Sequence, residues 1–129
     1  MALRVVRLGT RRAADEGPRL GTVRRPPRGV PRARFAKDDW YDLWLPDLAP
    51  SEPLVKQALR AQSNAQWRAF AKRYRKEMAA PEKTRLLELL AALSKVANFS
   101  VGCYCEDEAR CHRSVLRRLL RERGAKLVS

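Results

Sequence analysis

The sequence has a single histidine, His112, and only three cysteines, two of which are Cys103 and Cys105. An odd, closely spaced set of cysteines differs from the disulfide framework of a small secreted protein. No apolar run approaches the roughly 18 residues that a membrane-spanning helix requires. The first residues also lack the long apolar segment and small-residue cleavage site of a signal peptide. We therefore expect a cytoplasmic protein with reduced thiols and no membrane partner.

Motifs that would identify a cofactor are missing as well. The sequence contains neither a glycine-rich phosphate loop nor a dinucleotide-binding fingerprint. A tyrosine-phosphatase loop would place an arginine six residues after its cysteine, but Cys111 and Ala109 occupy those positions after Cys105 and Cys103. We predict no cofactor.

The length and composition favour one folded unit. A chain of 129 residues suits a single domain over residues 1–129. A hydrophobic content of 45% is enough for a core that needs neither disulfides nor metal.

The net charge of +14 is unevenly distributed along the chain. Residues 1–34 carry ten arginines against Asp15 and Glu16, a balance of +8, whereas residues 35–59 have a balance of −3. An excess of this sign favours polyanionic partners, such as nucleic acid or phosphorylated small molecules. The alternative is compositional bias, because arginine outnumbers lysine 21 to 7.

Hydrophobic spacing predicts strands that alternate with helices. We expect strands at 2–9, 19–25 and 99–105 and a short one at 126–128. Helices are expected from Ser51 as N-cap to about Ala61, from a cap at Asn64 to Met78, and over 81–96 and 111–123. Helix 81–96 is nearly all apolar and should be deeply buried. This order predicts an α/β fold, a single compact domain with a small, mostly parallel sheet flanked by helices.

A basic, proline-rich loop follows the second expected strand. Prolines in PPRGVPRARF, residues 26–35, exclude a helix because proline lacks the amide donor and restrains the residue before it. The candidate anion-binding residues are Arg24, Arg25, Arg28, Arg32 and Arg34. The aromatic residues of segment 38–51, Trp40 and Trp44 among them, are either core anchors or a stacking platform for bases.

The stretch CYCEDEARCHR, residues 103–113, holds all the cysteines and the histidine, and it joins an expected buried strand to a helix. Ligands of open α/β sheets bind at such strand ends. A thiol near a helix N-terminus is stabilised as thiolate, a histidine carries protons near neutral pH, and an arginine clamps anions. The candidate catalytic residues are Cys105, Glu106, Cys111, His112 and Arg113.

The same stretch has less specific interpretations. Cys103 is interpreted as a small buried hydrophobic residue, and His112 and Arg113 are adjacent, so they point in different directions. Structural zinc sites usually draw on separate C-x2-C-type knuckles, and a helix-borne Cys-His pair is a poor chelate. We predict no metal site from the spacing.

Several motifs occur in the order found in one known family. Cys105 with Glu106, followed by Cys111, His112 and Arg113, resembles the Cys/Glu and C-H-R motifs of domain-of-unknown-function family 488, to which the YeaO-like proteins are related. Residues 40–51 and the helix with Trp67, Phe70, Tyr74, Glu77 and Met78 resemble further segments of that family. The resemblance covers most of residues 3–128. It implies a compact α/β domain and no particular activity, and YeaO-like members look to have Asn-His in place of Cys111-His112.

Three functions remain open from the sequence. The first is a domain that binds or acts on nucleic acid or a phosphorylated ligand at the strand-to-helix junction. The second is a Cys/His-dependent enzyme on a small anionic substrate, with Arg25 and Arg113 as anion clamps. The third is a protein-interaction module that uses Trp40, Trp44 and the basic helix.

Overall fold

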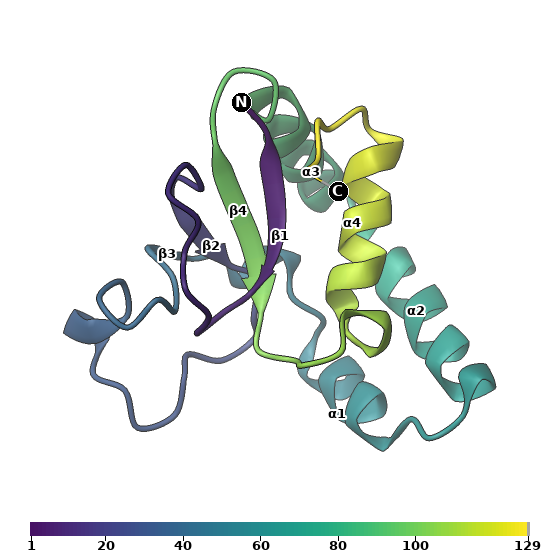
Figure 1. Ribbon diagram of the computed structural model, residues 1–129. Helices are drawn as coiled ribbons and strands as arrows, with labels where there is room; N and C mark the ends of the chain where they lie inside the picture. Colours follow the sequence, from purple (N-terminus) through teal and green to yellow (C-terminus); the bar gives the residue numbers. More distant parts are fainter. Residues whose placement is uncertain (129) are drawn as a thin grey trace.

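The computed structural model describes residues 1–128, in which a four-stranded parallel sheet packs against four α-helices (Figure 1). The strand order is β1-β4-β2-β3, and every pair is parallel, as the sequence predicted for the sheet. The strands are β1 (Leu3–Arg7), β2 (Arg19–Gly21), β3 (Leu43–Trp44) and β4 (Phe99–Cys103). The helices are α1 (Glu52–Arg60), α2 (Asn64–Met78), α3 (Pro81–Leu93) and α4 (His112–Glu122).

Strand β4 is an inner strand of the sheet, between β1 and β2. All five of its residues are buried, as expected for a strand covered on both faces. It pairs with β1 on one side, where Val5 is opposite Val101, and with β2 on the other, where Leu20 is opposite the same residue. The expected strand near the end of the chain is a single parallel bridge between Leu3 and Leu127.

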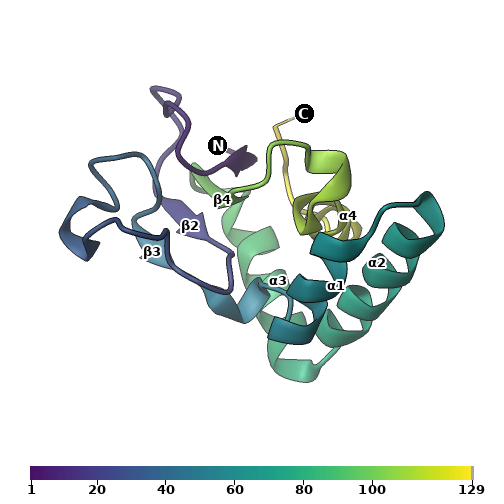
Figure 2. The same ribbon diagram turned by 90° about the horizontal axis from the view of Figure 1, so that it is seen from below.

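The helices pack together beside the sheet, whereas the segment between β2 and β3 projects away from them (Figure 2). The main core lies between sheet and helices and includes Phe70, Leu87, Val101 and Leu116. A second, smaller cluster is formed by Leu8, Val23, Tyr41, Cys103 and Cys111. Within residues 1–128, no helix combines the length and apolar character required to cross a bilayer.

Several boundaries differ from the sequence expectation. The N-cap of α2 is Ser63 rather than Asn64, because the Ser63 hydroxyl accepts from the Gln66 amide and the Gln66 side chain reciprocates in a capping box. The short strand β3 was not predicted. The basic loop contains one turn of 3-10 helix at Arg32–Arg34, which begins directly after Pro31 and therefore avoids the missing amide.

Helix α3 is less buried than its composition suggested. Leu87, Leu90 and Ala91 face the core, but Leu89 is 53% exposed and Leu93 is 40% exposed. A helix at the edge of a small domain has one face to bury, so the apolar residues on its other face remain in solvent.

Candidate functional site

A cavity of about 750 Å³ opens at the carboxyl edge of the sheet. Because all strands are parallel, the segments that follow β1, β2 and β4 leave the sheet at this edge and contribute to the same cavity. This is where ligands of open α/β sheets bind. Helix α1 contributes Glu52, Val55 and Ala58 to the wall.

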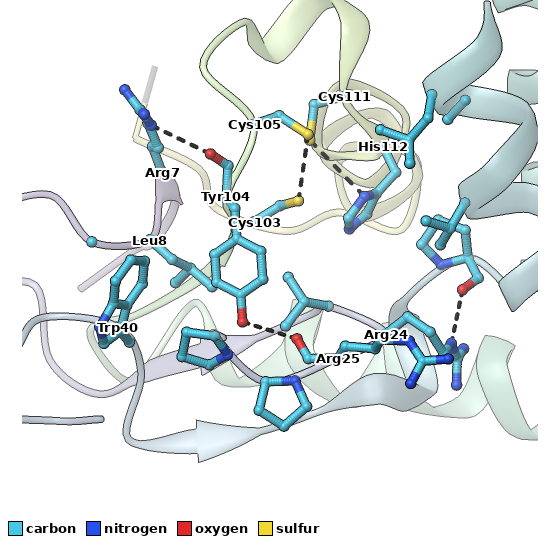
Figure 3. A pocket seen from close by; sticks show the side chains of 18 of the residues that line it. Arg7, Leu8, Arg24, Arg25, Trp40, Cys103, Tyr104, Cys105, Cys111 and His112 are labelled. Carbon is cyan, nitrogen blue, oxygen red and sulfur yellow. Dashed lines mark hydrogen bonds between the residues drawn. The ribbon is translucent and has the colours of Figure 1, made fainter. Parts of the chain in front are cut away.

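The floor of the cavity holds the three cysteines and His112 (Figure 3). Cys103 ends β4, Cys105 lies two residues beyond it, and Cys111 is the N-cap of α4. The Sγ atoms of Cys103 and Cys105 are 3.8 Å apart, and the Sγ of Cys111 is 3.9 Å from Nδ1 of His112. Cys103, Cys111 and His112 are buried, whereas Cys105 is exposed. The four residues lie within ten positions in the sequence, and Cys103, interpreted from the sequence as a core residue alone, is part of the cluster as well as of the core.

The thiols of the cluster differ in acidity. Hydrogen bonding from Cys103, and then from Cys105, holds the pKa of Cys111 well below its ordinary value, against the opposing effect of burial. Hydrogen bonding with Cys105, then with Cys111, and desolvation raise the pKa of Cys103. Within the cluster these contacts favour a thiolate at Cys111 over one at Cys103, and Cys111 lies at the positive end of the α4 dipole.

A hydrogen bond to a backbone carbonyl fixes the orientation of the His112 ring. Its Nε2 lies 2.7 Å from the carbonyl oxygen of Thr22, in the segment that follows β2. A carbonyl oxygen only accepts, so Nε2 carries the proton and donates it to this bond. Nδ1 is then the ring nitrogen on the side of Cys111. Tyr74 packs edge-on against the imidazole ring, with ring centroids 5.6 Å apart.

Arginines from three separate segments surround the opening of the cavity. The sequence predicted a role for Arg25 and Arg28, and both are exposed and line the cavity. Arg7, at the end of β1, and Arg110, just before Cys111, are further lining residues that sequence reasoning missed. Among the lining residues Glu52 is the single acid, and its carboxylate is 3.1 Å from Arg25. The charged residues that line the cavity are therefore one acid and five arginines, Arg24 among them.

The remaining arginine candidates have other contacts. Arg24 lines the cavity, but its guanidinium donates to the carbonyl oxygens of Pro46, Ala49 and Pro50 and so supports the start of α1. Arg34 pairs with Asp38 at 3.1 Å. Arg32 is exposed and lies outside this cavity, beside a smaller hollow near Tyr41.

Two of the five catalytic candidates are not among the residues that line the cavity. Glu106 is exposed, and its carboxylate lies 3.6 Å from the guanidinium of Arg7. Arg113 is 4% exposed and donates to the carbonyl oxygen of Cys105 at 2.5 Å. Arg113 and His112 point in different directions, as their adjacency predicted. Cys105, Cys111 and His112 share the cavity floor.

Two aromatic residues form part of the cavity wall. Trp40 and Tyr104 are half-buried and meet edge to face, with ring centroids 5.7 Å apart. The Tyr104 hydroxyl donates to the carbonyl oxygen of Arg25 at 2.9 Å, which ties the arginine loop to the strand-end segment. Gly9 has a φ of +87°, and a Cβ there would lie 2.7 Å from the Trp40 ring, so the bare backbone allows this packing.

A comparison with family models identifies the family of the chain. The family model described as the active DUF488-N3 subclade matches residues 3–124, nearly the whole chain. The chain belongs to the DUF488 family. The match spans the CYCEDEARCHR stretch and every lining residue of the cavity, so the site lies within the part of the chain that defines the family. No curated protein and no solved structure matches this DUF488 chain.

Proposed function

We propose that the cavity binds a phosphate-bearing ligand with a planar group, either a free nucleotide or a single exposed nucleotide of a nucleic acid. The observation that carries this proposal is the convergence of Arg7, Arg25, Arg28 and Arg110 on one cavity whose only acid is Glu52. Guanidinium groups bind phosphate oxygens with paired, charge-assisted hydrogen bonds.

The size and wall chemistry support a ligand of this class. A volume of about 750 Å³ falls within the range of small-molecule sites. The half-buried rings of Trp40 and Tyr104 offer apolar surface for a base, since bases stack on aromatic side chains. A duplex does not fit such a cavity, so the ligand would be a mononucleotide or an unstacked nucleotide of a single strand.

The test is fluorescence anisotropy with labelled single-stranded and double-stranded DNA and RNA across a salt series, with mononucleotides as competitors. We expect single strands to bind better than duplexes and nucleotides to compete. Affinity should fall steeply with salt, because phosphate binding releases counterions. Absence of binding at low salt to every nucleic acid and nucleotide would refute the proposal.

A charge-matched pair of variants makes the test specific. Arg25→Ala with Arg28→Ala removes two cavity arginines, whereas Arg118→Ala with Arg121→Ala removes two exposed arginines of α4 outside the cavity. The first pair should weaken binding and reduce the slope of log affinity against log salt by about 1.5, as expected for two lost phosphate contacts. Equal losses from both pairs would mean that general charge, and not the cavity, binds the ligand.

The second candidate is chemistry on the bound ligand with the Cys111 thiolate as nucleophile. It is favoured by the 3.9 Å separation of Cys111 Sγ from His112 Nδ1 at the start of α4. Such a pair is the usual arrangement of a nucleophile beside a base. Iodoacetamide should then modify Cys111 of the chelator-treated protein, located by peptide mass spectrometry, and a nucleotide should protect it. Modification of Cys105 alone would exclude this candidate.

A further inference from the structure

The floor of the cavity brings metal-binding atoms together from three positions of the chain. The Sγ atoms of Cys103 and Cys111 and a ring nitrogen of His112 all lie within 4.8 Å of one another. The thiol of Cys105 is beside them, 3.8 Å from that of Cys103. Figure 3 shows these side chains converging from the end of β4 and the start of α4.

The separations among the three ligand atoms are close to the edges of a tetrahedral zinc site. Zinc lies about 2.3 Å from thiolate sulfur and about 2.0–2.1 Å from imidazole nitrogen, so neighbouring ligands are about 3.8 Å apart for two sulfurs and about 3.5 Å for sulfur and nitrogen. The observed separation between Cys111 Sγ and His112 Nδ1 is 3.9 Å, and no pair of ligand atoms among Cys103, Cys111 and His112 is more than 4.8 Å apart. Movements of about 1 Å would therefore complete the coordination of an ion.

His112 is oriented as a metal ligand requires. Its Nε2 donates to the Thr22 carbonyl at 2.7 Å, so Nδ1 is the nitrogen on the side of Cys111 and is the atom that would bind an ion. Metal-bound histidines usually donate their second N–H to a carbonyl or carboxylate in this way. Thr22 is fully buried, and its hydroxyl donates to the Gly102 carbonyl. The residue whose carbonyl accepts from His112 is therefore itself held in place.

The ligand types restrict the choice of metal. Thiolate and imidazole select zinc and similar soft or borderline ions, whereas Ca²⁺ and Mg²⁺ require oxygen ligands. Cys103, Cys111 and His112 are all at most 7% exposed. The three protein ligands are therefore fixed by the core, and the accessible side of the cluster faces the cavity, where Cys105 lies.

We propose that Cys103, Cys111 and His112 bind one Zn²⁺ or a similar divalent ion, with the fourth position open to the cavity next to Cys105. Three protein ligands and one open position are the arrangement of catalytic zinc sites. An oxygen of a ligand held by the arginines, or a water molecule, would occupy the open position and be polarised there. The inference does not rest on the proposed nucleotide ligand. It assigns Cys111 as a metal ligand, so it excludes the free nucleophile of the second candidate.

The test uses the full chain, reduced and freed of metal with a chelator, and titrates it with Co²⁺ alone. We expect one Co²⁺ per chain, with thiolate-to-cobalt charge-transfer absorption in the near ultraviolet and tetrahedral d–d bands in the visible. Zinc should displace the cobalt and remove both features. The titration of the wild-type protein tests the metal site without any variant. Absence of charge-transfer absorption at excess Co²⁺ would overturn the proposal of a metal site.

Variants assign the ligands. Cys111→Ser and His112→Gln should each weaken Co²⁺ binding by more than about 100-fold, beyond the 10–100-fold cost of losing an outer partner. Cys105→Ser should retain one Co²⁺ per chain, with a changed spectrum at most. Circular dichroism verifies that each variant is folded. Tight binding that survives Cys111→Ser in a folded protein would overturn the assignment.

The metal site and the proposed nucleotide binding can be refuted independently of each other. Arg25→Ala with Arg28→Ala should bind Co²⁺ as the wild type does, because neither arginine is a ligand. Loss of nucleotide binding with a normal cobalt spectrum would remove the proposed function alone. A protein that binds nucleotides but shows no cobalt band would retain that function and lose the metal.

Discussion

The Nη2 atom of Arg113 donates a hydrogen bond of 2.5 Å to the carbonyl oxygen of Cys105. Arg113 is 4% exposed and is the second residue of α4, so its buried guanidinium ties the segment after β4 to the helix that follows. A second tie comes from Arg117, which binds the carboxylate of Glu108 at 2.8 Å. The position of Cys105 is thus set by the protein before any ligand arrives.

Replacing Arg113 by methionine should release this segment. The Cys105 carbonyl would lose a charge-assisted donor, which is worth about 1.5–3 kcal/mol. We expect a lower free energy of unfolding in urea and faster amide hydrogen exchange over residues 104–110. Arg118→Met, on the exposed side of the same helix, is the control and should change neither. Unchanged exchange in the Arg113 variant would mean that the segment is held by other contacts.

A buried ion pair predicts how stability depends on pH. Arg19 and Glu16 form a salt bridge with side chains 1% and 3% exposed, and the Glu16 carboxylate also accepts from Ser100. Although desolvation acts to raise the pKa of Glu16, the hydrogen bonds from Arg19 and Ser100 lower it below its ordinary value of 4.5. The carboxylate is therefore favoured in the folded state. Its contribution is complete above about pH 4.5 and is lost as pH falls through the lower folded-state pKa.

Glu16→Gln separates this effect from general acid unfolding. The variant leaves Arg19 buried without its counter-charge, so it should lose about 3–5 kcal/mol at neutral pH. Its loss relative to wild type should shrink as the pH falls below 4.5. Asp15→Asn, whose partner Arg4 is 30% exposed and whose own side chain is 72% exposed, should lose about 1 kcal/mol or less. Equal losses in both variants at neutral pH would contradict the role of the buried pair.

Two glycines with similar backbones provide a matched test of packing at the start of β2. Gly17 has a φ of +76°, and a Cβ there would lie 1.9 Å from the carbonyl oxygen of Asn98. Gly29 has a φ of +70°, with nothing within 4 Å of the added atom. Gly29→Ala should therefore lower the free energy of unfolding only by the cost of a left-handed backbone for alanine, about 1–2 kcal/mol. Gly17→Ala should cost clearly more, because backbone atoms must move. Equal melting temperatures for the two variants would contradict this difference.

The sequence predicted elements whose determinants are local. Strand β4 has apolar residues on both faces, α4 begins after Cys111, and Gly124 ends it with a φ of +83°. Strand β3 was missed because Leu43 and Trp44 are exposed and are strand only through pairing with β2. A hydrophobic pattern cannot indicate a strand of two residues that forms only by pairing with a neighbouring strand.

For the candidate site, too, the sequence predicted the residues that are close together in the chain and missed the others. The strand-to-helix stretch located Cys105, Cys111 and His112, since all three lie within one short segment. The contribution of Thr22 is a backbone carbonyl, which any residue would supply, so no sequence pattern reveals it. Arg7 reaches the cavity only because β1 pairs beside β4, where Arg7 is opposite Cys103.

The aromatic residues of the cavity wall allow the two parts of a nucleotide to be tested apart. Trp40 lines the cavity but is far less polar than the arginines, so it should contact the base and not the phosphates. Trp40→Leu should weaken nucleotide binding by about 1–3 kcal/mol, the usual value of one stacked base, and leave the affinity for inorganic pyrophosphate unchanged. Arg25→Ala with Arg28→Ala should weaken both ligands.

Isothermal titration with a nucleoside diphosphate and with pyrophosphate measures the difference. Trp44→Leu is the control, because Trp44 is 42% exposed and lies outside the cavity, where its indole donates to the Val23 carbonyl at 2.7 Å. That variant should retain both affinities. If Trp40→Leu weakens pyrophosphate as much as the nucleotide, the ring supports the shape of the cavity and does not stack on a base. The ligand class would then be a phosphorylated molecule without an aromatic group.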